Sequence, residues 1–88
     1  SFCKHVIGTG RELAIEKAGE HALVCDTRFA RSGEITSYLG VPIANADSII
    51  VGVLCVFDST ERDWGVGDVS LLTQLSVVLT RALASVDA

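Results

Sequence analysis

The stretch SYLGVPIANADSIIVGVLCVFD, residues 37–58, decides the fold of this 88-residue chain. Two apolar runs, 37–43 and 49–57, flank the polar segment 44–48, which has the composition and length of a hairpin loop. We therefore expect two strands that pair antiparallel. Pro42 has no N–H to donate, so its position should face away from the pairing or lie at a bulge. Gly52 should mark a kink or a close backbone approach.

The second of these strands is apolar on both faces. One face carries Ile49, Val51, Val53, Cys55 and Phe57, and the other carries Ile50, Leu54 and Val56. A strand with two apolar faces is typical of a sheet that is covered on both sides. We therefore predict helices on both faces of an antiparallel sheet.

The segment that follows the hairpin predicts a long terminal helix. Gly65 can serve as its N-cap with Asp68 three residues later, and no Pro or Gly interrupts residues 68–88. At 100° per residue one arc of this helix is apolar and the remainder is polar. We expect the apolar stripe to be buried against the sheet; its members are Leu71, Leu72, Leu75, Val78, Leu79, Ala82, Leu83 and Val86.

The half of the chain before the hairpin is less regular. We expect a short helix over residues 1–7 with Ser1 as its N-cap, ended by Gly8-Thr9-Gly10, and then a half-buried strand over 12–17. Residues 18–34 mix apolar and charged side chains and predict one short helix inside a long loop. Such long connections are often lids or binding loops, so this loop is where a ligand should be sought.

Composition excludes several classes of protein. The net charge is −4 and Lys and Arg form no cluster, so neither nucleic acid nor a membrane is expected as a partner. The longest apolar run, 49–57, is too short to span a bilayer. One domain is expected, and because the chain begins with Ser1 we expect it to be a piece of a longer protein.

The three cysteines indicate reduced thiols rather than a metal or disulfide site. Cys3, Cys25 and Cys55 are separated by intervals that match neither a CxxC pair nor a zinc site, and an odd number cannot pair fully. We expect them to act as small apolar side chains in a cytoplasmic protein. His21 and Cys25 share a helical spacing, but two ligands do not make a metal site. No metal or other cofactor is expected.

Five short motifs, in this order, resemble the GAF domain of bacterial sensory and signal-transduction proteins. They are Ser1-Phe2-Cys3, Thr9-Gly10, Tyr38-Leu39-Gly40-Val41-Pro42, the run 52–58 (GVLCVFD) and Arg62-Asp63-Trp64. The resemblance implies an α+β fold of the GAF/PAS kind, with helices flanking an antiparallel sheet and the irregular loop over a pocket. It also implies a regulatory, non-catalytic role beside an attached effector domain.

The chain departs from the family pattern in two places. The family carries a further N-terminal helix and first strands that have no counterpart in residues 1–88, so the chain is expected to be a partial GAF-like domain. An Asp that the family has after the first strand falls at Lys17 here. The ligand of a relative is therefore not carried over to this chain.

Candidate site residues follow from these expectations. An unknown small molecule is expected beside the irregular loop and the central strands, with Tyr38 and Phe29 as aromatic walls. The full set of pocket candidates is Tyr38, Phe29, Val24, Cys25, Asp26 and Cys55. Val69 and Val77 lie off the main helical stripe and suit a second helix in a dimer, and Val51 and Val53 suit pairing between chains.

Two alternatives to a sensor stay open at this level. The domain could be a ligand-free interaction or dimerisation module instead of a sensor. It could also be a cysteine-based reductase, since some enzymes with this fold reduce methionine sulfoxide, although the cysteine spacing here differs from theirs. In the family the absent strands lie beside residues 51–57, so this strand should present an open edge. We therefore expect a homodimer or a swapped oligomer.

Overall fold

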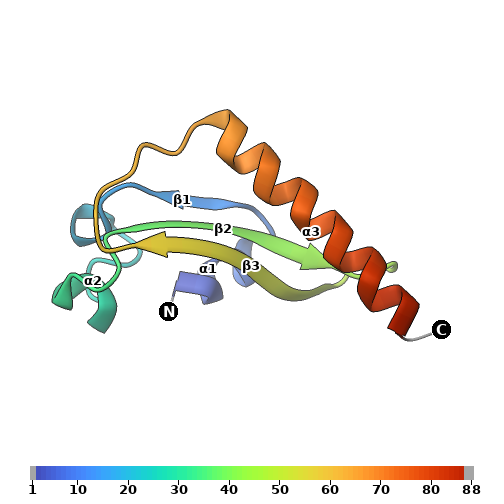
Figure 1. The fold of residues 1–88 in the computed structure, drawn as a ribbon. Coiled ribbons are helices and arrows are strands. Elements are labelled where there is room, and N and C mark those ends of the chain that lie inside the picture. The colour runs from blue at the N-terminus through green and yellow to red at the C-terminus, as the bar shows by residue number, and fades with distance from the viewer. Residues whose placement is uncertain (1, 87–88) are drawn as a thin grey trace.

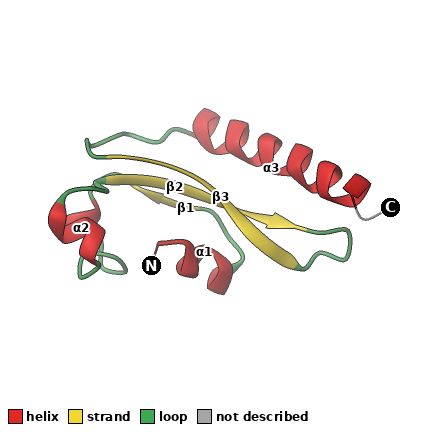
Figure 2. Ribbon diagram, turned by 60° about the horizontal axis from the view of Figure 1, so that its bottom comes forward, coloured by secondary structure: helices red, strands yellow, loops and turns green. Residues whose placement is uncertain are grey.

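A computed structural model describes residues 2–86, with only the backbone of 83–86. A three-stranded antiparallel sheet of order β1-β2-β3 forms its centre. Helix α3 lies along one face, whereas α1 and α2 lie on the opposite side (Figures 1 and 2), which confirms the predicted α+β class. The elements are α1 (Phe2–Thr9), β1 (Leu13–Ile15), the 3-10 turn η1 (Ala18–Glu20), α2 (Arg28–Ser32), β2 (Ser37–Ala44), β3 (Ile50–Asp58) and α3 (Val66–Val86).

The central hairpin forms as predicted. β2 and β3 pair in register from Ser37 opposite Asp58 as far as Ile43 opposite Gly52, and a bulge follows next to Gly52. β1 pairs with β2 only from Tyr38 to Gly40, so Pro42 lies beyond the end of β1 and has a partner strand on one side alone. Pro42 therefore has one side without a partner strand, and Gly52 lies beside a bulge, as the sequence predicts for the two residues.

The core has one cluster on each face of the sheet. The cluster toward α1 comprises Phe2, Val6, Ile15, Ala18, Val24 and Tyr38, all nearly inaccessible to solvent. The cluster toward α3 is smaller and comprises Leu39, Val41 and Leu72. Burial of large apolar side chains contributes about 1.5–3 kcal/mol each, so the α1 face contributes more to stability than the α3 face.

Helix α3 begins as predicted and is fixed near both ends. The Oδ2 atom of Asp68 accepts a hydrogen bond from the Gly65 N–H at 2.9 Å, which satisfies a backbone donor at the start of the helix. Three turns later the Thr80 hydroxyl donates to the Ala44 carbonyl at 2.8 Å. The helix is thus attached to the last residue of β2.

The expected burial of the apolar stripe is wrong for most of α3. Of the stripe residues with described side chains, only Leu72 is buried, and Leu71, Leu75, Val78 and Leu79 are exposed. The face against the sheet instead runs through Val69, Leu72, Ser76 and Thr80. The apolar arc is turned by roughly a third of a turn away from the sheet, and the helix packs mainly on β2, with fewer contacts to β3. Leu83 and Val86 fall outside the described side chains.

The strand β3 is an edge strand. The expectation of a strand inside a sheet covered on both sides is therefore wrong for this chain, since Val51, Val56 and Phe57 are each exposed. The open edge expected from the missing family strands is present. Within residues 2–86 no strand pairs with the outer side of β3.

The N-terminal elements are close to their predicted positions. α1 continues through Gly8 and Thr9 and ends at Gly10, whose φ of 68° is the left-handed conformation that a helix end favours in glycine. The proposed cap, Ser1, lies outside the described residues. β1 is shorter than predicted but keeps its faces, with Ile15 buried and Ala14 exposed.

The loop between β3 and α3 is held by an ion pair that is sensitive to acid. Arg62 donates through Nε at 3.0 Å and Nη2 at 2.6 Å to Oδ2 of Asp58, and these bonds hold the pKa of Asp58 below its usual 3.8. The stabilisation is therefore complete at neutral pH and is lost as the pH falls through the pKa of the folded state.

We predict that Asp58→Asn destabilises the domain slightly at pH 7 and that its difference from the unchanged protein shrinks below pH 3.8. Urea unfolding at pH 7 and at pH 3 measures both differences. A destabilisation that is equal at the two pH values would contradict the proposed role of the carboxylate charge.

Candidate functional site

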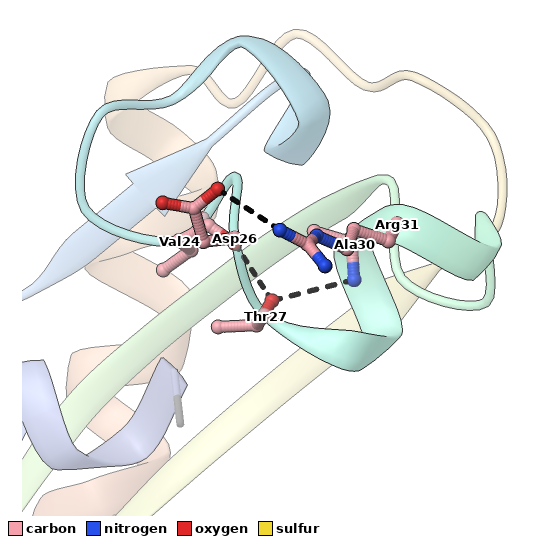
Figure 3. Close-up of polar contacts among 5 residues, drawn as sticks. All are labelled: Val24, Asp26, Thr27, Ala30 and Arg31. Carbon is pink, nitrogen blue, oxygen red and sulfur yellow. Dashed lines mark hydrogen bonds and ion pairs between the residues drawn. The ribbon is translucent and has the colours of Figure 1, made fainter.

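The loop 18–34 is ordered by local hydrogen bonds. The Thr27 hydroxyl caps α2 by accepting the Ala30 N–H at 3.3 Å, and it donates to the Val24 carbonyl at 2.7 Å (Figure 3). Arg31 and Asp26 form an exposed ion pair at 3.5 Å in the same view. Together with buried Val24, these contacts hold α2 at one end of the sheet.

α2 brings Phe29 to an apolar cavity on the α1 face of the sheet. This cavity, which we call the thiol pocket, has a volume of about 140 Å³. Four elements and the segment before β2 contribute to it, and none of its side chains is charged. The lining residues are Phe2, Cys3, Phe29, Ile35, Tyr38, Cys55 and Phe57.

The polar atoms of the thiol pocket belong to two thiols and one phenol. Cys3 Sγ lies 3.3 Å from the Tyr38 hydroxyl oxygen and forms a hydrogen bond with it, in which either group can donate. Burial raises the pKa of Tyr38 well above its usual value, and burial together with the neighbouring Cys3 thiol raises the pKa of Cys55. Both groups therefore keep their protons at neutral pH. The pocket offers a neutral and weakly polar surface.

Three of the six predicted pocket residues lie together. Tyr38, Phe29 and Cys55 line the thiol pocket. Val24 is instead a fully buried core residue, and Asp26 points to solvent in its ion pair with Arg31. Cys25 is half-buried in the loop and is not among the residues that line this pocket.

The predicted relay residues lie in four different environments. Val69 packs against the small cluster under α3, and Val53 packs against the α1 core, so neither is free for a partner. Val77 is exposed on α3 and Val51 is exposed on β3. Of the four predicted contact residues, Val51 and Val77 are therefore exposed to a partner, whereas Val53 and Val69 are not.

Sequence reasoning missed four pocket residues, Phe2, Cys3, Ile35 and Phe57, as parts of one site. Phe2 and Cys3 come from α1, which is 35 residues away from Tyr38 in the chain. Phe2 and Val6 lie at helical spacing on either side of Cys3 and indicated a short helix with an apolar face. This pattern could not reveal which strand the helix covers. Only the docking of α1 under β2 and β3 brings the thiols together.

Other cavities lack this convergence of groups. A cavity of about 250 Å³ near Lys17 and Ala30 is lined mainly by polar and charged residues, and one of about 380 Å³ lies at the start of α3 beside Trp64. Two cavities that described residues of the loop 18–34 line, of about 250 Å³ and 140 Å³, are each smaller than the roughly 300 Å³ of a typical ligand site. Among the described residues, no three His, Cys, Asp or Glu side chains are grouped to hold a metal ion. No described helix is both long and apolar enough to cross a bilayer.

Solved structures share this fold. A GAF domain region of a putative membrane protein from Geobacter sulfurreducens superposes with a TM-score of 0.77 at 16% identity over 96% of this chain. Free methionine-R-sulfoxide reductase from Neisseria meningitidis gives 0.74 at 20% identity over 90% of the chain. The GAF domain of an Acinetobacter phosphoenolpyruvate-protein phosphotransferase gives 0.62 at 25% identity over 96%.

The fold is therefore that of solved GAF domains, and the sequence agrees. The GAF domain family model matches residues 1–83, so the chain belongs to the GAF domain family, as the five motifs indicated. It covers 44%, 56% and 49% of the three solved chains just described, which is about half of their length. No match was found among curated proteins. Domains of this family commonly act in signalling and ligand sensing.

Proposed function

We propose that this domain is a non-catalytic sensor that binds a small, uncharged and largely apolar molecule in the thiol pocket. The observation that carries the proposal is the convergence of α1, α2, β2 and β3 on one cavity without charged side chains. A molecule there contacts four elements at once, so its binding free energy can alter how they pack. The volume of about 140 Å³ favours a ligand of one ring or smaller.

The signal is proposed to leave the domain through α3 toward an attached effector domain. The helix contacts β2 along the sheet and is bonded to Ala44 through Thr80. A shift of the hairpin would therefore move the helix. We propose a cytoplasmic location, and the three free thiols Cys3, Cys25 and Cys55 support it, because thiols stay reduced in that compartment.

A reductase is the less favoured alternative. The reductase from Neisseria meningitidis shares the fold, but nucleophilic cysteines require an accessible thiol with a lowered pKa. Burial raises the pKa of Cys55, which disfavours the thiolate. We expect no turnover of free methionine-R-sulfoxide with dithiothreitol as reductant. Steady turnover that is lost in Cys55→Ser would replace the sensor by the enzyme.

The sensor is tested with phenol as a one-ring, uncharged probe, and binding is followed by two-dimensional amide NMR. We expect saturable shifts at residues around the thiol pocket, and about ten-fold weaker binding to Phe29→Ala, which removes one aromatic wall. Leu23→Ala is the matched control, since Leu23 is an exposed apolar residue of the same loop that does not line the pocket.

Two results would reject the sensor. Phenol that binds Phe29→Ala as tightly as the unchanged protein would remove the thiol pocket as the site. Shifts confined to α3 would favour the ligand-free interaction module instead.

A further inference from the structure

Two thiols of the thiol pocket approach the same oxygen atom. Cys3 Sγ on α1 lies 3.3 Å from the Tyr38 hydroxyl oxygen. The Tyr38 ring folds back over Gly40, since a Cβ atom at Gly40 would collide with that same hydroxyl. Gly40 pairs with Cys55 across the hairpin, and directly opposed residues of antiparallel strands lie about 5 Å apart. The Tyr38 hydroxyl therefore lies next to both Cys3 and Cys55.

The thiol of Cys55 is also within hydrogen-bonding reach of the thiol of Cys3. Burial raises the pKa of Cys55 most, and the Cys3 thiol raises this pKa further, partly through a hydrogen bond between the two side chains. A hydrogen bond with Tyr38 acts on the same pKa in the opposite direction. A disulfide requires neighbouring backbones, and α1 packs directly on β3. We call these three side chains, Cys3, Tyr38 and Cys55, the dithiol cluster.

The surroundings of the dithiol cluster favour one product of thiol oxidation over the others. None of the residues that line the thiol pocket is charged, and an unpaired charge in such a cavity is costly. Sulfinic and sulfonic acids are anionic at neutral pH, whereas a disulfide is uncharged and largely apolar. Oxidation in this cavity should therefore stop at the disulfide.

We propose that Cys3 and Cys55 are a site of reversible oxidation, at which hydrogen peroxide converts the two thiols into a disulfide between α1 and β3. The Cys3 sulfur attacks one peroxide oxygen, the O–O bond breaks, and the other oxygen leaves as water with the Cys3 proton. The Cys55 sulfur then attacks the sulfenic sulfur of Cys3, and the hydroxyl group leaves as water with the Cys55 proton. The two thiols lose two electrons and two protons, and the peroxide is reduced to two molecules of water.

The neighbours of the two thiols assign the first step to Cys3. Burial and the Cys3 thiol raise the pKa of Cys55, so Cys55 keeps its proton at neutral pH. Cys3 lies beside the Tyr38 hydroxyl, which also keeps its proton because burial raises the pKa of Tyr38. That hydroxyl can donate a hydrogen bond to the Cys3 sulfur while the sulfur loses its own proton.

This inference goes beyond the sensing of a small molecule and does not depend on a bound ligand. It also differs from the reductase, because the oxidation is a single stoichiometric event that needs no methionine sulfoxide. Disulfides of cytoplasmic proteins are commonly transient and redox-sensing, so the site agrees with the proposed location. The disulfide would fix α1 to β3 and so alter how the two elements move.

Peptide mapping of the purified chain without reductant tests the proposal. Cleavage after Lys and Arg places the three cysteines in separate peptides, 1–4, 18–28 and 32–62. After treatment with hydrogen peroxide we expect peptides 1–4 and 32–62 to be joined, and we expect dithiothreitol to separate them. The same treatment in urea is the control. An unfolded chain closes its shorter loops more readily, and the loop from Cys3 to Cys55 is the longest of the three possible ones.

Two variants separate the dithiol cluster from the remaining thiol. Cys25→Ser is the matched control, because Cys25 does not line the thiol pocket, and it should form the same cross-link at the same rate. Cys55→Ser should stop at the sulfenic acid of Cys3, which dimedone captures as a stable adduct. Far-UV circular dichroism checks that both variants are folded. Amide hydrogen exchange in α1 should slow when the unchanged chain is oxidised and recover with dithiothreitol.

Several results would overturn the proposal, and the mapping of the unchanged chain gives them without any variant. A cross-link through Cys25, cross-links between separate chains, or the same mixture of cross-links in the folded chain and in urea would each do so. Free thiols at Cys3 and Cys55, under conditions that oxidise the chain in urea completely, would do so too.

Discussion

Gly40→Ala is expected to lower the free energy of unfolding by about 2–3 kcal/mol, although it adds a single methyl group. A Cβ atom at this position would lie 2.7 Å from Cε1 and 2.8 Å from Cζ of Tyr38, two residues away on the same face of β2. The ring cannot move aside, because it packs against Phe2 with centroids 5.1 Å apart and its hydroxyl is bonded to Cys3. The strain falls on the largest buried side chain of the core.

The matched control is Gly52→Ala in the neighbouring strand. There a Cβ atom would meet only Cδ1 of Ile43 at 3.9 Å, an ordinary contact, so we expect a change below about 1 kcal/mol. Urea unfolding should place the midpoint of Gly40→Ala about 2 M below that of the control. Equal midpoints would show that the Tyr38 ring is not confined.

Trp64→Ala is the second large effect, with an expected loss of about 3 kcal/mol. Trp64 packs against the cluster of Leu39, Val41 and Leu72, and its indole N–H donates to the Ile15 carbonyl at 2.9 Å. Removing it empties the space between the sheet and the start of α3. Because this cluster is small, it has little other apolar surface with which to compensate.

Trp64→Phe separates the two contributions of this side chain. It keeps most of the ring contact and removes only the hydrogen bond, so we expect a loss of about 1 kcal/mol. Thermal unfolding followed by far-UV circular dichroism suits both variants, because Trp64 is the only tryptophan of the chain. If Phe and Ala cost the same, the hydrogen bond and not the packing fixes the helix.

The parts of the fold that were predictable depend on signals within a few residues. The hairpin was readable because its turn residues and two apolar runs are adjacent, and α3 because Gly65 and Asp68 form its cap within one turn.

The burial of α3 was not predictable from its own pattern. An amphipathic stripe shows that a helix has an apolar side, but it does not state which neighbour covers that side. Here Leu72 meets the sheet while Leu71 and Leu75 face the open edge of β3. The prediction assumed that the sheet was the only available neighbour.

The site was predictable only in part for a related reason. Tyr38 and Cys55 belong to the central hairpin, which was predicted, and the observed pairing of Gly40 with Cys55 brings them together. Cys3 joins them through the docking of α1, which is a contact across 35 residues that no local pattern encodes. Asp26 was a pocket candidate on its position in the loop, yet Arg31 holds its side chain toward solvent.

Strand β3 lines the thiol pocket through Cys55 and Phe57 and pairs with β2, along which α3 lies and to whose last residue it is bonded. An occupant of the cavity that shifts the hairpin would therefore change the free energy of any contact that α3 makes outside the domain, and that contact would change the occupant's affinity by the same factor. A titration curve recorded with α3 held in one position would then be displaced from the curve recorded with α3 free, although nothing that holds the helix touches the cavity.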